Sequence, residues 1–195
     1  MKNLDTLKRF FTKSVMKNAC AIFTDGFEEI ELIVTTDVLL RAGVSVKLAS
    51  AKNELEVKGA HRIKIIADTT VDKINDEDFD VMILPGGPGS FSLKDDENIL
   101  DFVRKFDFGG KLVCAICAAP IILHNAGILE NKKYCSHPCV HDALPSVDKS
   151  SRVVTDENII TAIGPGASID FALAIITKLF GQKISDEIKK DLLYK

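Results

Sequence analysis

The sequence predicts a doubly wound α/β domain, in which helices cover both faces of a mostly parallel sheet. Short apolar segments typical of buried strands alternate with segments in which apolar residues recur at helical spacing. Parallel strands need crossover connections, so this alternation favours a helical layer on each side of the sheet. Ligands of such sheets bind outside the carboxyl ends of the strands, and three distinctive loops follow expected strands at that edge.

The expected elements follow one another along most of the chain. Val81–Leu84 is an unbroken apolar run that ends in glycines and prolines, which is typical of a buried strand. Ile30, Ile33 and Leu39 recur at helical spacing, and Gly43 follows them where a helix-ending glycine is common. The expected strands are 19–23, 44–50, 61–67 (a strand or one arm of a hairpin), 81–84, 111–116, 152–155 and 158–163. The expected helices are 28–41, 97–105, 118–126, 168–180 and 185–193.

The composition bounds the class of protein. With 195 residues, of which 46% are hydrophobic, the chain is long enough for one globular domain and too apolar for disorder. No apolar run reaches the roughly 18–20 residues of a membrane span, and a net charge of −3 argues against a nucleic-acid-binding protein. Five cysteines, an odd number at low density, indicate reduced thiols. We therefore expect a cytoplasmic protein that has neither a membrane nor a nucleic acid as a partner.

The first 18 residues differ from the rest of the chain. They carry a net charge of +4 and leave −7 on residues 19–195. Leu4, Leu7 and Phe10 recur there at helical spacing, which predicts an N-terminal helix or a frayed tail. An organelle-targeting signal is the less favoured interpretation, because the segment is short and poor in serine and arginine. We expect a basic extension over residues 1–18, followed by a single domain over residues 19–195.

Cys117 lies where an expected strand turns into an expected helix. Ala118, Ala119 and Pro120 follow it, and proline is well tolerated in the first turn of a helix. This is the layout of a nucleophile elbow, which holds a side chain above the sheet at a helix N-terminus. The elbow predicts a thiol pKa below the free value of about 8.5 and hence a reactive cysteine. A buried, inert cysteine is the alternative.

Two further loops offer groups to the same crevice. The glycine-rich loop after the fourth strand leaves the N–H groups of Gly86 and Gly87 unobstructed, as an oxyanion site requires, although a tight turn alone also explains these glycines. Three glutamates start the first helix, where the helix dipole favours carboxylates. If one of them, Glu31, points at Cys117, it must be largely protonated, because a neighbouring thiolate raises the pKa of a carboxyl group. It would then donate a hydrogen bond to the thiolate or act as general acid and base.

Other arrangements of cysteine and histidine compete with this one. Cys114 and Cys117 have the spacing of a thiol redox pair, but such pairs lie at a helix N-terminus and Cys114 would lie inside a strand. Four alternating residues further along offer ligands for a metal ion, although structural zinc sites usually pair two separated clusters. We favour the interpretation that one of the four reaches the Cys117 crevice. The four residues are Cys135, His137, Cys139 and His141.

Taken together, these loops resemble the ThiJ/PfpI superfamily, in the branch of the Parkinson-disease-associated deglycase and its bacterial relatives. The resemblance covers about residues 19–193 and leaves the basic first 18 residues outside. The matching motifs are Gly26-Phe27-Glu28-Glu29-Ile30-Glu31, Asp37-Val38-Leu39-Leu40-Arg41-Ala42-Gly43, Leu84-Pro85-Gly86-Gly87, Ala115-Ile116-Cys117-Ala118-Ala119-Pro120, and Gly164-Pro165-Gly166 before Asp170-Phe171-Ala172.

The resemblance implies a flavodoxin-like three-layer α/β sandwich of the class I glutamine amidotransferase-like kind, and a homodimer. By this resemblance, Cys117 is the reactive and oxidation-sensitive cysteine, Glu31 is the protonated glutamate, and His137 is the active-site histidine. The oxyanion N–H groups would belong to Gly87 and Ala118.

The sequence departs from the family pattern at two positions. Ala118 stands where the protease-like and chaperone-like branches carry a histidine directly after the nucleophile, so we do not expect a protease. Ile163 stands where human-type members carry an arginine that helps to bind anions. Anion binding would therefore rest on backbone groups and on Arg41, or be weaker than in those members.

The leading hypothesis is a cofactor-independent glyoxalase or protein deglycase that protects against oxidative stress. Its substrates would be methylglyoxal, glyoxal or their early adducts. Cys117 would add to the aldehyde, while Glu31, with His137, moves the proton. This chemistry requires neither a metal nor an organic cofactor. The alternative is an interaction or chaperone-like protein that senses redox state through oxidation of Cys117 to a sulfinate.

Overall fold

One sheet of seven strands forms the centre of the molecule. The computed structural model describes residues 16–195, so the predicted N-terminal helix lies outside the described residues. The strands are β1 (Asn18–Phe23), β2 (Ser45–Ser50), β5 (Thr69–Thr70), β6 (Val81–Leu84), β7 (Leu112–Ile116), β8 (Val153–Asp156) and β9 (Ile159–Ala162). Their order is β5-β2-β1-β6-β7-β9-β8, and every neighbouring pair is parallel except β8 and β9.

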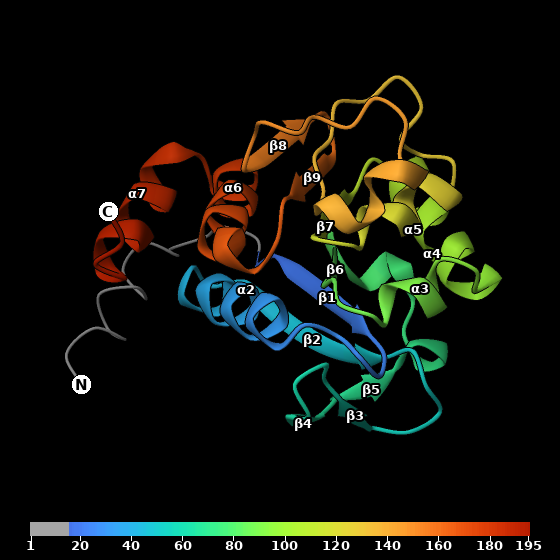
Figure 1. Ribbon diagram of the computed structural model, residues 1–195. Helices are drawn as coiled ribbons and strands as arrows, with labels where there is room; N and C mark the ends of the chain where they lie inside the picture. Colours follow the sequence, from blue (N-terminus) through green and yellow to red (C-terminus); the bar gives the residue numbers. More distant parts are fainter. Residues whose placement is uncertain (1–15) are drawn as a thin grey trace.

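Helices cover both faces of this sheet (Figure 1). One face carries α2 (Glu29–Arg41), α6 (Ser168–Phe180) and α7 (Gln182–Asp191), with α6 packed against the other two. The opposite face carries α3 (Ser90–Leu93), α4 (Glu97–Phe108) and α5 (Pro120–Asn125). The predicted three-layer α/β fold with a mostly parallel sheet is confirmed. No helix of the described residues is long and apolar enough to cross a membrane.

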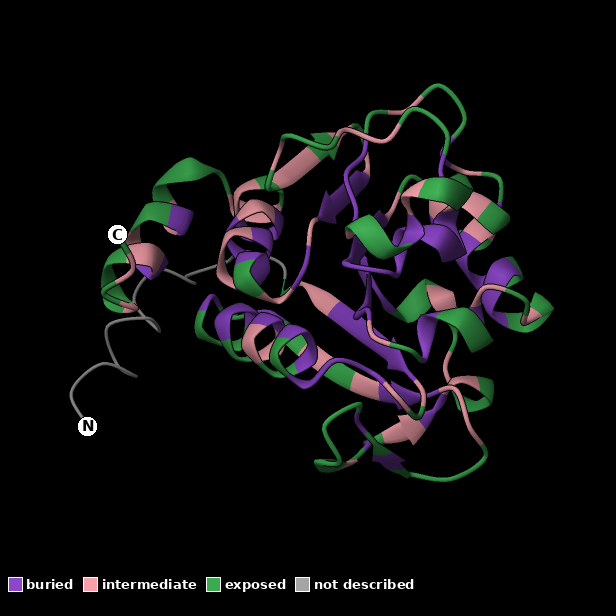
Figure 2. Cartoon of the chain, viewed as in Figure 1, coloured by how far each residue is buried: buried purple, intermediate pink, exposed green. Residues whose placement is uncertain are grey.

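The central strands are buried because helices shield both of their faces (Figure 2). Every residue of β6, β7 and β9 is buried, and so is all of β1 except Asn18. Strands of this kind appear in the sequence as unbroken apolar runs, which is why their positions could be predicted. At the end of β1, Phe23 packs edge-on against Phe27, with ring centroids 5.0 Å apart. This contact anchors the loop before α2 in the core.

The structure adds elements that the sequence pattern does not indicate. The expected segment 61–67 contains β4 (Lys64–Ile66), which pairs with β3 (Glu56–Lys58) in an antiparallel hairpin outside the main sheet. The elements β3, β5 and α3 are too short to produce a periodic signal. Helix α7 begins three residues before its predicted start, because Gly181, with a φ of 87°, leads directly from α6 into it.

Candidate active site

Cys117 occupies the sharp turn between β7 and α5. Its φ of 65° lies in the left-handed region, which non-glycine residues rarely adopt. Two backbone hydrogen bonds hold the turn: the Cys117 N–H donates to the Ala162 carbonyl of β9 (2.8 Å), and the Cys117 carbonyl accepts from the His137 N–H (2.8 Å). The predicted nucleophile elbow is therefore present at the carboxyl end of the sheet, and Cys117 is only 8% exposed there.

Two glycines allow the loop after β6 to approach Cys117 closely. A Cβ on Gly86 would lie 2.6 Å from the Cys117 Cβ and 2.8 Å from the Glu31 Oε2, closer than such atoms pack. Gly87 has a φ of 88°, and a Cβ there would lie 2.4 Å from a carbonyl oxygen of the loop before α2. The N–H groups of Gly87 and Ala118 lie close enough to the Cys117 sulfur to lower the pKa of its thiol. The two predicted oxyanion donors are therefore both beside the thiol.

Glu31 enters the crevice from the first turn of α2. It is fully buried, and its Oε2 accepts a hydrogen bond from the Gly86 N–H (2.7 Å). The Gly86 carbonyl in turn accepts from the Glu28 N–H (3.0 Å), so one glycine joins the β6 loop to the start of α2. The other carboxyl oxygen, Oε1, is buried without a hydrogen-bond partner among the described residues. That oxygen is free to carry a proton, and the carboxyl group interacts with the Cys117 thiol beside it.

Glu31 and Cys117 perturb each other's ionisation. Burial, with a smaller effect from the charge of Glu28, raises the pKa of Glu31 to about 7. Burial, and then the charge of Glu31, raises the pKa of the Cys117 thiol above its usual range, although the two backbone N–H groups lower it. The expectation of a lowered thiol pKa at the elbow is therefore wrong, because burial outweighs the helix terminus. Near neutral pH the Cys117 thiol therefore keeps its proton while the Glu31 carboxyl group gains and loses one, so Glu31 is the group suited to proton exchange.

His137 lies next to Gly164, which is also close to the Cys117 sulfur. The His137 Cδ2 and the Cys117 Sγ lie 3.4 Å and 3.9 Å from the position that a Cβ would take on Gly164, so both flank this glycine. The Cys139 N–H donates to the His137 Nδ1 (3.2 Å). We infer from this bond that the ring proton sits on Nε2. The structure thus brings His137, one of the four alternating cysteines and histidines, beside Cys117.

The four alternating residues do not assemble into a metal site. Cys135 is buried and its thiol donates to the Thr161 carbonyl (3.4 Å), while a ring nitrogen of His141 bonds a backbone carbonyl (3.2 Å). Among residues 16–195, no cluster of potential metal ligands includes any of the four. Cys114 is fully buried within β7, where burial raises the pKa of its thiol, and it forms no disulfide with Cys117.

Arg41 does not reach the crevice, contrary to expectation. It lies in the last turn of α2, ten residues after Glu31, which corresponds to about 15 Å along a helix axis. Ion pairs with Asp37 (2.7 Å) and Asp191 (3.6 Å) hold its guanidinium there. The predicted anion-binding role of Arg41 is therefore wrong, and backbone N–H groups are the candidate anion donors.

Arg152 braces one wall of the crevice, and no sequence signal identifies it. Its guanidinium donates to the Gly166 carbonyl (2.6 Å) and forms an ion pair with Asp170 of α6 (3.0 Å). These contacts hold the loop that contains Gly164, which lies against the Cys117 sulfur. Sequence reasoning misses Arg152 because only the antiparallel pairing of β8 with β9 brings it to this loop.

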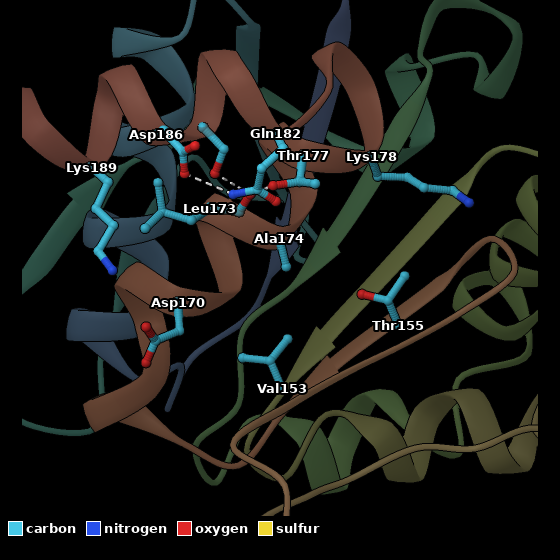
Figure 3. A pocket seen from close by; sticks show the side chains of 11 residues that line it. Val153, Thr155, Asp170, Leu173, Ala174, Thr177, Lys178, Gln182, Asp186 and Lys189 are labelled. Atoms are coloured by element: carbon cyan, nitrogen blue, oxygen red, sulfur yellow. Dashed lines mark hydrogen bonds between the residues drawn. The ribbon is translucent and has the colours of Figure 1, made fainter.

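A surface pocket of ≈ 560 Å³ lies away from the crevice, between the edge strand β8 and helices α6 and α7 (Figure 3). Its described lining includes Asp170, Asp186 and Lys189, with Val153 and Thr155 from β8. Neither Cys117 nor Glu31 belongs to that lining. We therefore assign the candidate active site to the Cys117 crevice and not to this pocket.

Comparison with known proteins links the chain to one family. The family model described as the DJ-1/PfpI family matches residues 17–178. The chain is 37% identical over 182 residues to protein dj-1beta of Drosophila melanogaster, which covers 91% of this chain and 97% of that protein. It is also 35% identical over 168 residues to the glutathione-independent glyoxalase DJR-1.2 of Caenorhabditis elegans, which covers 85% and 89%.

A solved structure of the first of these relatives and one further relative agree with this result. The crystal structure of Drosophila melanogaster DJ-1beta superposes with a TM-score of 0.89 at 36% identity, covering 93% of this chain and 100% of that one. Protein DJ-1 homolog A of Arabidopsis thaliana is 37% identical over 188 residues, but the aligned part spans only 47% of its length, against 94% of this chain.

Proposed function

Because the chain belongs to the DJ-1/PfpI family, we propose that it is a cysteine-dependent glyoxalase or deglycase that needs no cofactor. Its substrates would be methylglyoxal, glyoxal or the early adducts that these aldehydes form on proteins. The observation that carries the proposal is the pairing of Cys117 with Glu31, a buried carboxyl group whose pKa is about 7. The name of one relative, a glutathione-independent glyoxalase, supports the same reaction class.

The first step joins Cys117 to the aldehyde carbon of methylglyoxal. As the sulfur–carbon bond forms, the thiol proton passes to the Glu31 carboxylate, which then protonates the new alkoxide oxygen. The product is a hemithioacetal, and Glu31 is again a carboxylate. A base with a pKa near 7 suits this exchange, because it accepts and releases a proton with equal ease at neutral pH.

The second step moves a hydrogen along the substrate. Glu31 removes the proton from the former aldehyde carbon, which gives an enediol, and returns it to the adjacent carbon. The proton of the hemithioacetal hydroxyl group passes to the second carbonyl oxygen, so the product is a lactoyl thioester. The His137 Nε2 proton would polarise the second carbonyl oxygen during this transfer. Water then hydrolyses the thioester to lactate and restores the thiol, so the overall reaction adds one water molecule to methylglyoxal and needs no oxidant.

Lactate production from methylglyoxal tests this function. We expect the purified chain to form lactate without glutathione and equally well after treatment with a metal chelator. Cys139→Ser is the matched control, because Cys139 is an exposed thiol close to the same crevice with no assigned role in the reaction. A folded protein that forms no lactate, or that requires glutathione, contradicts the proposal.

A second candidate function is redox sensing through Cys117. The N–H groups that surround the sulfur, and a protonated Glu31, would also hydrogen-bond the oxygens of a sulfinate. A solved structure of oxidized Toxoplasma gondii DJ-1, which is 30% identical to this chain, supports this candidate. Mass spectrometry after mild peroxide treatment separates the candidates, because a sensor requires Cys117 to oxidise before the exposed Cys139.

We also propose that two copies associate through the outer face of α2. Large apolar side chains are exposed there and on the neighbouring hairpin, where a soluble monomer rarely gathers them. They are Ile30, Ile33 and Leu40 on α2, with Ile63 and Ile66 on the hairpin.

Ile33→Glu should raise the dissociation constant of the dimer by about 100-fold, because each dimer would lose two buried isoleucines and gain two charges. Sedimentation equilibrium measures the change. Phe108→Glu, at an exposed phenylalanine at the end of α4, is the control and should leave the dimer intact. Equal dissociation constants for the wild type and Ile33→Glu would place the interface elsewhere.

A further inference from the structure

Two buried glutamates and a histidine converge beside the N-terminus of α2. The His61 Nδ1 lies 3.0 Å from the Glu29 Oε2 and 3.9 Å from the Glu28 Oε1. One ligand atom from each of these residues lies within 4.8 Å of the others. Among residues 16–195, no other group of three potential metal ligands is as close together. The histidine comes from the turn of the β3–β4 hairpin, and the glutamates come from the start of the helix.

Backbone hydrogen bonds hold one oxygen of each carboxylate and leave the other oxygen on the side of His61. The Glu29 Oε1 accepts from the N–H groups of His61 (2.7 Å) and Ile63 (3.4 Å), while its Oε2 pairs with the His61 Nδ1 (3.0 Å), so an ion would take the place of the proton between these two atoms. The Glu28 Oε2 accepts from the Glu31 N–H (2.9 Å) as the cap of α2, so Oε1 is the free oxygen. That oxygen has no hydrogen bond from any described residue and points toward His61.

The cluster has an excess of buried negative charge. Glu28 and Glu29 are 7% and 5% exposed, and no lysine or arginine of the described residues forms an ion pair with either of them. Within the described part of the chain, the solvent-exposed ring of His61 is the one group that pairs with them, and it is cationic only when it is protonated. Adjacent buried carboxylates are costly unless a cation or several donors compensate them, and here each retains an oxygen that a cation could bind.

We propose that Glu28, Glu29 and His61 bind a zinc ion. Imidazole nitrogen and carboxylate oxygen are both zinc ligands, and at bond lengths of about 2.0–2.1 Å the ligands of a tetrahedral ion lie about 3.3 Å apart. Two of the separations, 3.0 Å and 3.9 Å, lie on either side of this value, and the third is at most 4.8 Å, so rotations of the side chains would bring the three atoms to one ion. Three protein ligands leave a fourth position, which is open to solvent on the side of the exposed imidazole.

The bound ion would clip the hairpin to the helix. The hairpin turn already contacts the helix start: the Ala60 N–H donates to the Phe27 carbonyl (2.9 Å). A Cβ on Gly59 would lie 2.3 Å from the Glu29 Oε1, so the turn packs directly on this carboxylate. This rigid turn places His61 before any ion arrives, which reduces the ordering that binding requires. The ligands differ from the groups that carry the proposed reaction, because neither Cys117 nor the carboxyl group of Glu31 supplies one, although Glu28 bonds the Glu31 N–H.

Zinc titration followed by calorimetry tests the site, at neutral pH and in a Cys117→Ser/Cys139→Ser background that removes the thiols nearest the surface. We expect one zinc per chain and a rise in unfolding temperature on binding. His61→Asn and Glu28→Gln should each weaken zinc binding by about tenfold or more. Loss of a residue that only orients a metal ligand already costs about tenfold, and loss of a ligand itself should cost at least as much. Glu28→Gln keeps an oxygen that can cap α2, so it separates loss of a ligand from loss of the helix.

His124→Asn and Glu130→Gln are matched controls at a histidine and a glutamate outside the cluster, and they should bind zinc as the background does. Zinc binding that persists unchanged in both His61→Asn and Glu28→Gln would overturn the proposal. So would the absence of zinc binding once the two thiols are removed. Circular dichroism of each variant establishes that a loss of binding does not reflect unfolding.

Discussion

Replacement of Cys117 by serine should lower the rate of lactate formation from methylglyoxal by about 10³-fold or more. Serine fits the same turn, so the elbow, with its φ of 65°, and its two backbone hydrogen bonds should persist. The chemistry changes because Glu31, whose pKa is about 7, is far too weak a base to activate an alkyl hydroxyl group. The N–H groups of Gly87 and Ala118 also lie beside the position of a sulfur atom, which is larger than oxygen.

The measurement is the steady-state rate of lactate production at saturating methylglyoxal, with lactate identified by NMR. Cys139→Ser should remain within about twofold of the wild type, because no step is assigned to that thiol. If Cys117→Ser retained more than a tenth of the wild-type rate while remaining folded, Cys117 would not be the nucleophile.

Glu31→Gln should slow the same reaction by about 10²–10⁴-fold, the usual contribution of a general acid and base. The glutamine oxygen can still accept the hydrogen bond from the Gly86 N–H, so the geometry of the crevice should be kept. The substitution removes the group that accepts the thiol proton and transfers a proton between the two substrate carbons. The glutamine amide cannot accept a proton at neutral pH, so the thiol stays protonated.

The stability of Glu31→Gln relative to the wild type should increase as the pH rises. The pKa of Glu31 is about 7 in the folded state against an ordinary value of 4.5, so between these values the folded state binds more protons than the unfolded state. The wild type therefore loses stability as the pH rises through this window, by a total of about 3 kcal/mol. Glu31→Gln does not titrate and should lack this loss.

Urea unfolding at several pH values between 4 and 8 measures the effect. The free energy of unfolding of Glu31→Gln relative to the wild type should increase across the window and level off above pH 7. Parallel pH profiles for the two proteins would show that Glu31 has an ordinary pKa. Opposite changes in activity and stability would identify Glu31 as a group whose buried charge is retained for the reaction.

The sequence reveals those parts of the site that depend on local backbone geometry. Cys117 can be found because an apolar strand, small residues and Pro120 surround it, and this local pattern indicates the elbow. The approach of Gly86 and Gly87 follows in the same way from a glycine-rich turn at a strand end. Both predictions need no knowledge of the rest of the fold.

Properties that depend on distant segments cannot be predicted in this way. A lowered thiol pKa is the natural expectation because the helix terminus is visible in the sequence, whereas the burial that raises the pKa is not. Arg41 cannot serve the crevice, because a continuous α2 carries it about 15 Å from Glu31. His61 gives no signal in the sequence, because only the pairing of β3 with β4 turns it toward the glutamates.

The role of Gly86 has a consequence for how this scaffold can change over evolutionary time. Its N–H holds Glu31, and its carbonyl holds the backbone of Glu28, so main-chain atoms set the spacing between acid and nucleophile. Side chains on the outer surfaces of the helices take no part in these two bonds. Substitutions there can therefore accumulate without changing the distance between Glu31 and Cys117.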